Sequence, residues 1–213
     1  MIELVIFDLD GVLVDSEPIS TRILMAMLAQ VGLPMDEAAA EQRFLGRSRV
    51  ENLAFIEQQL GRAVPEDFEA NWQAQVLAAF RQELRPVPGI AAALDRLTLP
   101  TCVASGSDPV RIRLSLELAG LLPRFAGRLF SATQVARGKP APDLFIFAAR
   151  SLGVAPAHCV VVEDSVPGVQ AAVAARMPVL GYAARNSAAL LAQAGAVTFD
   201  DMARLPGLVE QLS

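Results

Sequence analysis

The feature that most constrains the fold of this chain is the alternation of short apolar runs with helical patterns after residue 85. Each apolar run precedes a stretch in which apolar residues recur at helical spacing. This alternation predicts right-handed crossovers between parallel strands, and therefore an α/β, Rossmann-like parallel sheet with helices on both faces. The expected strands are residues 101–104, 128–131, 159–162 and 178–182, and the expected helices are residues 108–118, 143–152, 166–175 and 187–193.

The first strand of this sheet lies far from the others in the sequence. Residues 3–7 form a continuous apolar run, which is typical of a strand buried on both faces. The stretch that follows carries helical patterns and no convincing strand pattern. We therefore expect an α/β core of residues 1–15 and 85–213, with an all-helical domain of residues 16–84 inserted after the first strand. Such an insert could act as a lid over the carboxyl ends of the strands. Its clearest helical patterns are residues 18–31, 49–60 and 65–83.

Composition excludes several classes of function. The net charge of −5 argues against broad nucleic-acid binding, which needs a basic face, although a small anionic substrate is still compatible with it. No apolar run is long enough to span a bilayer, and the N-terminus lacks the pattern of an export signal, so a membrane partner is not expected and a cytoplasmic location is. Cys102 and Cys159 lie in strand-like runs and are expected to be buried and structural.

Four short segments with polar side chains lie in the loops that follow predicted strands. Because the carboxyl ends of parallel strands meet at one edge of a sheet, we expect these side chains to lie close together. They include carboxylates, hydroxyls and one ammonium group, an inventory that suits magnesium-dependent phosphoryl transfer. The residues are Asp8 and Asp10, Ser105 with Gly106 and Ser107, Lys139, and Glu163 with Asp164.

The chemistry of two neighbouring carboxylates explains this expectation. One of Asp8 and Asp10 could attack phosphorus, while the other protonates the leaving oxygen. Two close negative charges also need a cation, and Mg²⁺ prefers the oxygen ligands that Asp8, Asp10, Glu163 and Asp164 offer. Lys139 could neutralise the nucleophile and the charge that develops on the phosphoryl oxygens.

Each segment also has an ordinary structural interpretation. An Asp-x-Asp-Gly sequence is common in turns, and Lys139 could be an exposed loop lysine. Ser107 or Asp108, and also Ser165, could simply cap the helices that follow them. The shared position of the segments after successive strands favours a single site over four coincidences.

These segments resemble the motifs of the haloacid dehalogenase superfamily, in particular its phosphatases and β-phosphoglucomutase-like proteins with a small helical cap. Residues 7–17 resemble the first motif, and residues 138–143 and 162–168 match the third and fourth. The resemblance covers nearly the whole chain and implies Asp8 as nucleophile and Asp10 as general acid and base. It further implies Ser105, Gly106 and Lys139 as ligands of the phosphoryl group, and Asp8, the main-chain carbonyl of Asp10, Glu163 and Asp164 as ligands of Mg²⁺.

The resemblance also bears on the reaction. Mutases similar to β-phosphoglucomutase carry a His in the stretch that corresponds to residues 16–21, and this chain has Ser20 and no His there. Dehalogenases of the superfamily lack the second Asp of the first motif, so Asp10 argues against dehalogenation. In the predicted cap, Arg49 stands where sugar-phosphate members contact a substrate phosphate. Arg47 and Arg49 are equally compatible with solvated charges at the start of a helix.

The expected function is therefore that of a Mg²⁺-dependent phosphatase acting on a small phosphorylated metabolite through an aspartyl-phosphate. A sugar phosphate or sugar-acid phosphate, such as phosphogluconate, is favoured. Two alternatives stay open: a phosphosugar mutase of the β-phosphoglucomutase type, and a phosphate-responsive regulatory or binding protein similar to receiver domains. Receiver domains are far shorter than this chain and have no helical insert.

Overall fold

The structure is a computed structural model, and it describes residues 1–44 and 49–212. The chain divides into two compact units. One consists of Met1–Asp15 and Arg85–Ser213, and the other of Ser16–Leu84. We call them the core unit and the helical unit, and each is described by itself.

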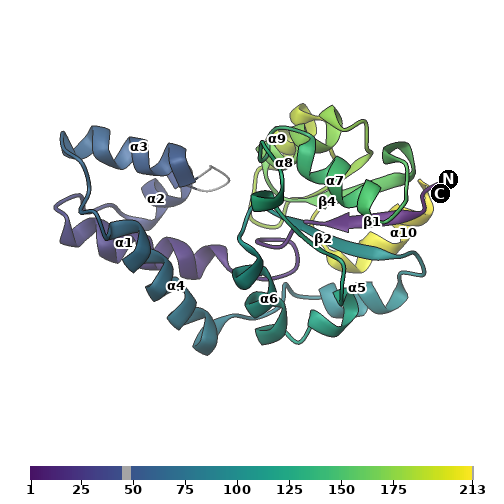
Figure 1. Ribbon diagram of the computed structural model, residues 1–213, viewed down its shortest axis with the longest axis horizontal. Coiled ribbons are helices and arrows are strands. Elements are labelled where there is room, and N and C mark those ends of the chain that lie inside the picture. The colour runs from purple at the N-terminus through teal and green to yellow at the C-terminus, as the bar shows by residue number, and fades with distance from the viewer. Residues whose placement is uncertain (45–48, 213) are drawn as a thin grey trace. The chain divides into compact units, whose positions relative to one another are not determined.

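The core unit is built on a six-stranded parallel sheet with the strand order β3-β2-β1-β4-β5-β6 (Figure 1). Strand β1 lies in the middle and pairs with β2 on one side and with β4 on the other. All four residues of β1 are buried, as expected for a central strand covered on both faces. The strands are β1 (Leu4–Phe7), β2 (Thr101–Ser105), β3 (Leu129–Ser131), β4 (Cys159–Glu163), β5 (Val179–Tyr182) and β6 (Val197–Phe199).

Helices cover both faces of this sheet (Figure 1). Three lie on one face: α7 (Asp143–Ser151), α8 (Val166–Ala174) and α9 (Ala188–Ala194). Three lie on the other: α5 (Ile90–Arg96), α6 (Pro109–Leu118) and α10 (Leu205–Glu210). Short 3-10 turns occupy Leu122–Phe125, Ala132–Gln134, Pro156–His158 and Met202–Arg204.

The alternation of side chains along β1 explains how one strand serves two apolar layers. Leu4 and Ile6 pack into the cluster formed with α7, α8 and α9. Phe7 points the other way, and its ring meets that of Phe125 edge-on, with 6.1 Å between the centroids. Cys102 and Cys159 belong to the first cluster and are fully buried, which agrees with the structural role expected from the sequence.

The helical unit contains α1 (Glu17–Gln30), α2 (Glu37–Phe44), α3 (Arg49–Leu60) and α4 (Phe68–Glu83). Its described residues form no strand. An apolar cluster that includes Leu28, Phe44 and Ile56 holds the helices together. An ion pair between Arg22 and Glu83, with 2.6 Å between Nη2 and Oε2, joins α1 to the end of α4.

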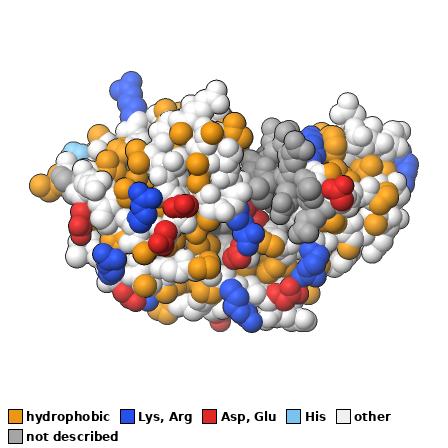
Figure 2. Space-filling model, turned by 180° about the vertical axis from the view of Figure 1, so that it is seen from behind, with side chains coloured by type: hydrophobic (Ala, Val, Ile, Leu, Met, Phe, Trp, Pro, Cys, Tyr) orange, Lys and Arg blue, Asp and Glu red, His pale blue; other side chains and the backbone are white. Residues whose placement is uncertain are grey.

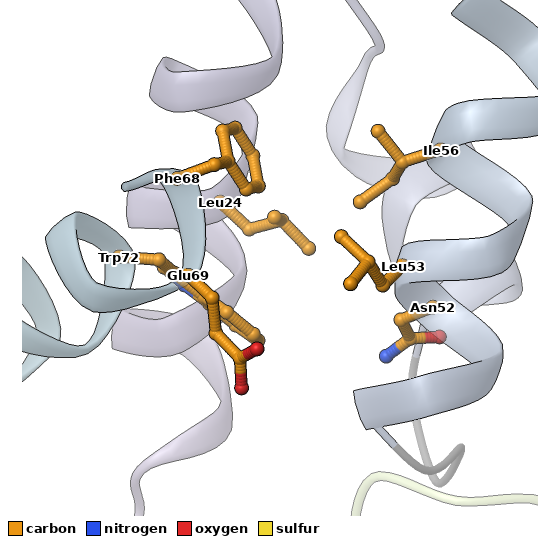
Figure 3. Close-up of a pocket in the computed structure, with 7 residues that line it drawn as sticks. All are labelled: Leu24, Asn52, Leu53, Ile56, Phe68, Glu69 and Trp72. Carbon is orange, nitrogen blue, oxygen red and sulfur yellow. The ribbon is translucent and has the colours of Figure 1, made fainter. Parts of the chain in front are cut away.

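A pocket opens among α1, α3 and α4 of the helical unit (Figure 3). Its walls are mainly apolar, but two buried polar atoms in it have no hydrogen-bond partner. These atoms are Oδ1 of Asn52 and Nε1 of Trp72. The lining residues are Leu24, Asn52, Leu53, Ile56, Phe68, Glu69 and Trp72.

The fold class predicted from the sequence is confirmed: the chain forms a parallel α/β sheet with helices on both faces and carries a helical insert. The named strands and helices occur within a few residues of their expected bounds. The sequence patterns did not single out β6, α2, α5 or α10.

The surface of the core unit carries mixed charge. On the face drawn in Figure 2, Lys and Arg side chains are interspersed with Asp and Glu.

Within the described part of the chain, no helix is both long enough and apolar enough to cross a membrane.

Candidate active site

The candidate site lies at the carboxyl end of β1, where the strand order reverses. Beyond β1 the sheet continues through β2 on one side and through β4 on the other, so the loops after these strands diverge and leave room for a ligand. Asp8 is the first residue after β1, and its backbone N–H donates to the carbonyl of Val162 in β4, at 2.9 Å. The side chain of Asp8 is therefore fixed at the switch point of the sheet.

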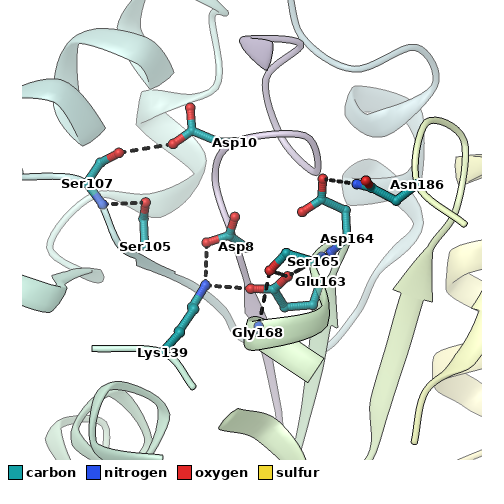
Figure 4. A network of polar contacts seen from close by, with 10 residues as sticks. All are labelled: Asp8, Asp10, Ser105, Ser107, Lys139, Glu163, Asp164, Ser165, Gly168 and Asn186. Atoms are coloured by element: carbon teal, nitrogen blue, oxygen red, sulfur yellow. Dashed lines mark hydrogen bonds and ion pairs between the residues drawn. The ribbon is translucent and has the colours of Figure 1, made fainter. Parts of the chain in front are cut away.

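Lys139 connects two of the carboxylates (Figure 4). Its Nζ lies 2.6 Å from Oδ1 of Asp8 and 2.6 Å from Oε1 of Glu163. The Lys139 side chain is only 11% exposed, so both ion pairs are shielded from solvent. Lys139 and Asp8 are 131 positions apart in the sequence, and the fold brings them into contact.

The second oxygen of Glu163 is held by the start of α8. Oε2 accepts hydrogen bonds from the backbone N–H groups of Asp164 and Ser165, at 2.9 and 2.8 Å, and from the Ser165 hydroxyl, at 2.9 Å. The Ser165 hydroxyl in turn accepts from the N–H of Gly168 and caps α8. Both oxygens of Glu163 are thus engaged, and its carboxylate orients Lys139 on one side and the helix start on the other.

Asp164 closes the other side of the site. Its Oδ2 accepts from the side-chain amide of Asn186, at 3.0 Å, in the loop after β5. Gly11 allows the first motif to approach this carboxylate: its φ is +76°, and a Cβ added there would overlap Asp164. A side chain at position 11 would therefore push apart the two loops that carry Asp10 and Asp164.

The loop after β2 carries the hydroxyl groups. Ser105 is buried, and its Oγ accepts from the N–H of Ser107, at 3.1 Å. The Ser107 hydroxyl donates to Oδ2 of Asp10, at 3.0 Å. Asp10 also receives a hydrogen bond from Arg111 in α6, with 3.0 Å between Nη2 and Oδ1.

Burial and charge shift the pKa values of the central pair. Burial raises the pKa of Asp8 to about 7; Lys139 opposes this shift, and the nearby carboxylates of Glu163 and Asp10 add to it. Burial disfavours the charged form of Lys139, but its two carboxylate partners outweigh this effect and raise the pKa of the ammonium group. Lys139 is therefore a permanent cation at physiological pH.

The acidic cluster fits a divalent cation. Asp8, Glu163 and Asp164 are all buried, and each offers a carboxylate oxygen within 4.8 Å of the others. Lys139 compensates one of these three negative charges, so a divalent ion could balance the remaining two. Oxygen donors at this spacing suit Mg²⁺.

The structure brings together most of the residues that the sequence singled out. Asp8, Lys139, Glu163 and Asp164 form one cluster, and Ser105 and Asp10 lie beside it through Ser107 (Figure 4). Gly106 follows Ser105 at the end of β2, and a Cβ added there would meet nothing within 4 Å. Arg47 lies outside the described residues. Arg49 begins α3, and its side chain lies outside them too.

Two neighbours of the site were not expected from the sequence. Asn186 follows β5, so the rule that directed attention to polar residues after strands would also have found it. Arg111 lies inside a predicted helix, where an arginine ordinarily indicates a solvated face. Its position in the first helical turn, three residues after the cap, was the available signal.

The chain matches the family model described as haloacid dehalogenase-like hydrolase over residues 2–176. This protein belongs to that family. The resemblance stated from the motifs is thereby confirmed, and so is the expectation of a phosphatase, because relatives along nearly the whole chain are named phosphatases.

Three similar proteins illustrate the relationship. The 6-phosphogluconate phosphatase of Escherichia coli is 32% identical over 97% of this chain and 94% of its own length. Hexitol phosphatase A of the same organism is 35% identical over 80% of this chain and 78% of its own length. A haloacid dehalogenase family hydrolase from Deinococcus radiodurans, solved with bound phosphate and sodium, is 33% identical with a TM-score of 0.83, over 99% of this chain and 96% of that one.

Proposed function

We propose that this phosphatase hydrolyses small phosphorylated metabolites with the help of Mg²⁺ and through an aspartyl-phosphate at Asp8. The observation that carries the proposal is the buried contact of Lys139 with both Asp8 and Glu163 at 2.6 Å, beside the carboxylate of Asp164. A lysine and three carboxylates would be costly to bury together without a function that uses their charge.

Asp8 and Asp164, with the main-chain carbonyl of Asp10, would hold the metal ion. Glu163 is a further candidate ligand, although its two oxygens already accept hydrogen bonds from Lys139 and from the start of α8. When bound, Mg²⁺ supplies positive charge that offsets the carboxylates and the phosphoryl oxygens.

In the proposed reaction, residues of the core unit act in two steps. A carboxylate oxygen of Asp8 attacks phosphorus, and the bond between phosphorus and the leaving oxygen breaks. Asp10 gives its proton to that oxygen and then takes a proton from the water that hydrolyses the aspartyl-phosphate. Lys139 holds Asp8 in place and, with Ser105 and the backbone at Gly106, stabilises charge on the phosphoryl oxygens.

We propose a sugar phosphate or sugar-acid phosphate as the substrate class. Two relatives along most of the chain are named for activity on 6-phosphogluconate and on hexitol phosphates, and both names denote polyhydroxylated esters. A phosphate contact by Arg49 and a cytoplasmic site of action stay predictions of the sequence.

The variant Asp8→Asn tests the nucleophile. It keeps the shape of the side chain but removes the attacking carboxylate, so we expect release of phosphate from 6-phosphogluconate to fall by at least about a thousandfold. Asp95→Asn is the matched control, because Asp95 pairs with Arg124 on the surface of the same unit. Mg²⁺-dependent turnover that survives in Asp8→Asn, measured beside a chelator blank, would contradict the mechanism.

The product distinguishes hydrolysis from transfer. A phosphatase releases inorganic phosphate, whereas a phosphosugar mutase returns an isomerised sugar phosphate and releases little. The absence of a His from residues 16–21 favours hydrolysis. A regulatory protein would instead accumulate phosphorylated Asp8 without turnover.

A further inference from the structure

The carboxyl group of Asp10 is held from two sides in the core unit. Arg111 donates from Nη2 to Oδ1, and Ser107 donates from its hydroxyl to Oδ2, each at 3.0 Å. The side chains of Arg111 and Asp10 are 25% and 26% exposed, so the ion pair is mostly withdrawn from solvent. Asp10 and Asp8 therefore have different cationic partners, Arg111 and Lys139 respectively.

The partners of Asp10 are themselves fixed by hydrogen bonds with Asp108 and with Ser131 at the end of β3. Asp108 caps α6 by accepting from the N–H groups of Val110 and Arg111, at 3.0 Å each. The Ser131 hydroxyl donates to the carbonyl of Ser107, at 2.7 Å. These contacts hold both donors before a substrate arrives, as preorganisation requires.

Helix stability alone does not explain an arginine at this place. Arg111 lies in the first turn of α6, where the helix dipole presents positive charge and a cation is unfavourable. The guanidinium group instead pairs with Asp10, which lies outside the helix. Arg113, two residues further along the same helix, is exposed.

We propose that Arg111, supported by Ser107, is a positioning residue for proton transfer by Asp10. The inference rests on the proposed function, in which Asp10 protonates the leaving oxygen. When that proton moves from Asp10 to the alkoxide, the carboxyl group gains a negative charge. The guanidinium group, which only donates, stabilises this charge and keeps the carboxylate aimed for the second step, while the Ser107 hydroxyl can donate to the carboxylate or accept from the acid.

Leaving groups of different basicity test this role. An alkoxide needs a proton as it departs, whereas p-nitrophenolate leaves readily without one. The parameter kcat/KM reports the steps up to departure of the alcohol. Arg111→Gln should therefore lower kcat/KM for 6-phosphogluconate by about 10- to 100-fold. For p-nitrophenyl phosphate, kcat/KM should fall by less than about threefold. Arg111→Lys keeps the charge and should recover part of the loss.

Controls separate this role from folding and from the proposed function itself. Arg113→Gln removes the same charge from the same helix and should leave both substrates within about twofold. Ser107→Ala is a smaller change and should show the same leaving-group dependence with a smaller factor. A wild-type protein that hydrolyses neither ester contradicts the proposed function. With an active wild type, an equal loss on both esters in Arg111→Gln, or a rise in KM alone, overturns the positioning role.

Discussion

At the scale of single residues, Gly168 leaves free the space that the Glu163 carboxylate occupies. A Cβ added at Gly168 would overlap the Glu163 carboxylate, so only glycine lets the first turn of α8 lie against this side chain. Gly168 therefore fixes where Glu163 points, and through it where Lys139 lies.

Gly168→Ala should consequently damage both stability and activity. The methyl group must displace the carboxylate or the helix, at a cost of about 1–3 kcal/mol. Gly207→Ala is a matched control, because Gly207 also follows a proline in the first turn of a helix and its added Cβ would meet nothing within 4 Å. That change should stabilise the protein by up to about 1 kcal/mol. Urea unfolding and phosphate release measure the two effects, and similar results for both variants would contradict the packing argument.

Sequence reasoning at this scale succeeded where chemistry follows a strand. Asp8, Ser105 and Asp164 were found because they come at or directly after the ends of parallel strands, and parallel strands end at one edge. It failed for Arg111, because its function depends on a contact with Asp10 that 101 positions separate. The only sign in the sequence is the position of this arginine in the first helical turn, where a cation is unfavourable, and that sign does not identify Asp10 as the partner.

At the scale of elements, α8 and α9 begin with the same kind of serine cap, but only the cap of α8 also contacts the candidate site. Both helices begin after a serine whose hydroxyl accepts a backbone hydrogen bond: Ser165 accepts from Gly168, and Ser187 accepts from Leu190. Only the Ser165 hydroxyl also donates to Glu163. The cap of α8 is thus also part of the site.

Replacing each cap by alanine separates the two functions. Ser165→Ala and Ser187→Ala should each destabilise the protein by about 0.5–2 kcal/mol through loss of the cap. Only Ser165→Ala should also reduce kcat, by about tenfold, because Glu163 loses one of the donors that aim it at Lys139. Thermal unfolding and steady-state kinetics give both quantities. An unchanged kcat in Ser165→Ala would show that the backbone donors alone orient Glu163.

The elements that sequence analysis did not single out are short or locally ambiguous. Strand β6 has three residues, and only Phe199 of these is buried, so its pattern lacks the apolar run of β1. Helix α5 has seven residues and begins directly after Gly89. The prolines and the glycine of residues 86–89 indicate a turn, and they mask the start of this short helix in the sequence. Both β6 and α5 depend on tertiary packing, which a local sequence pattern does not report.

At the scale of the whole molecule, the buried acids link stability to pH and to metal. Burial raises the pKa of Asp8 from 3.8 to about 7, so the folded protein binds this proton more tightly than the unfolded chain does. Without metal, stability should therefore fall as the pH rises from about 4 to about 7. Added Mg²⁺ replaces the proton and should raise Tm more at about pH 8 than at about pH 5. Thermal unfolding with EDTA or excess MgCl₂ measures this, and equal shifts at both pH values would contradict a site at Asp8.

The two connections between the units make the helical unit removable in principle. In the core unit, the N–H of Asp15 donates to the carbonyl of Arg85, and the N–H of Val87 donates to the carbonyl of Leu13, each at 3.0 Å. The chain therefore leaves and re-enters the core unit side by side, and a short Gly/Ser linker can replace residues 16–84 without stretching the backbone.

We expect the shortened protein to fold, because the core unit has its own sheet and apolar clusters. It keeps Asp8, Lys139, Glu163 and Asp164, so it should still release phosphate from p-nitrophenyl phosphate when Mg²⁺ is added. If the helical unit selects the substrate, the ratio of kcat/KM for 6-phosphogluconate to that for p-nitrophenyl phosphate should fall by about tenfold or more. Asp8→Asn in the shortened chain is the control for background hydrolysis. An unchanged ratio would assign selection to the core unit, and loss of cooperative unfolding would show that the core unit depends on the insert for its stability.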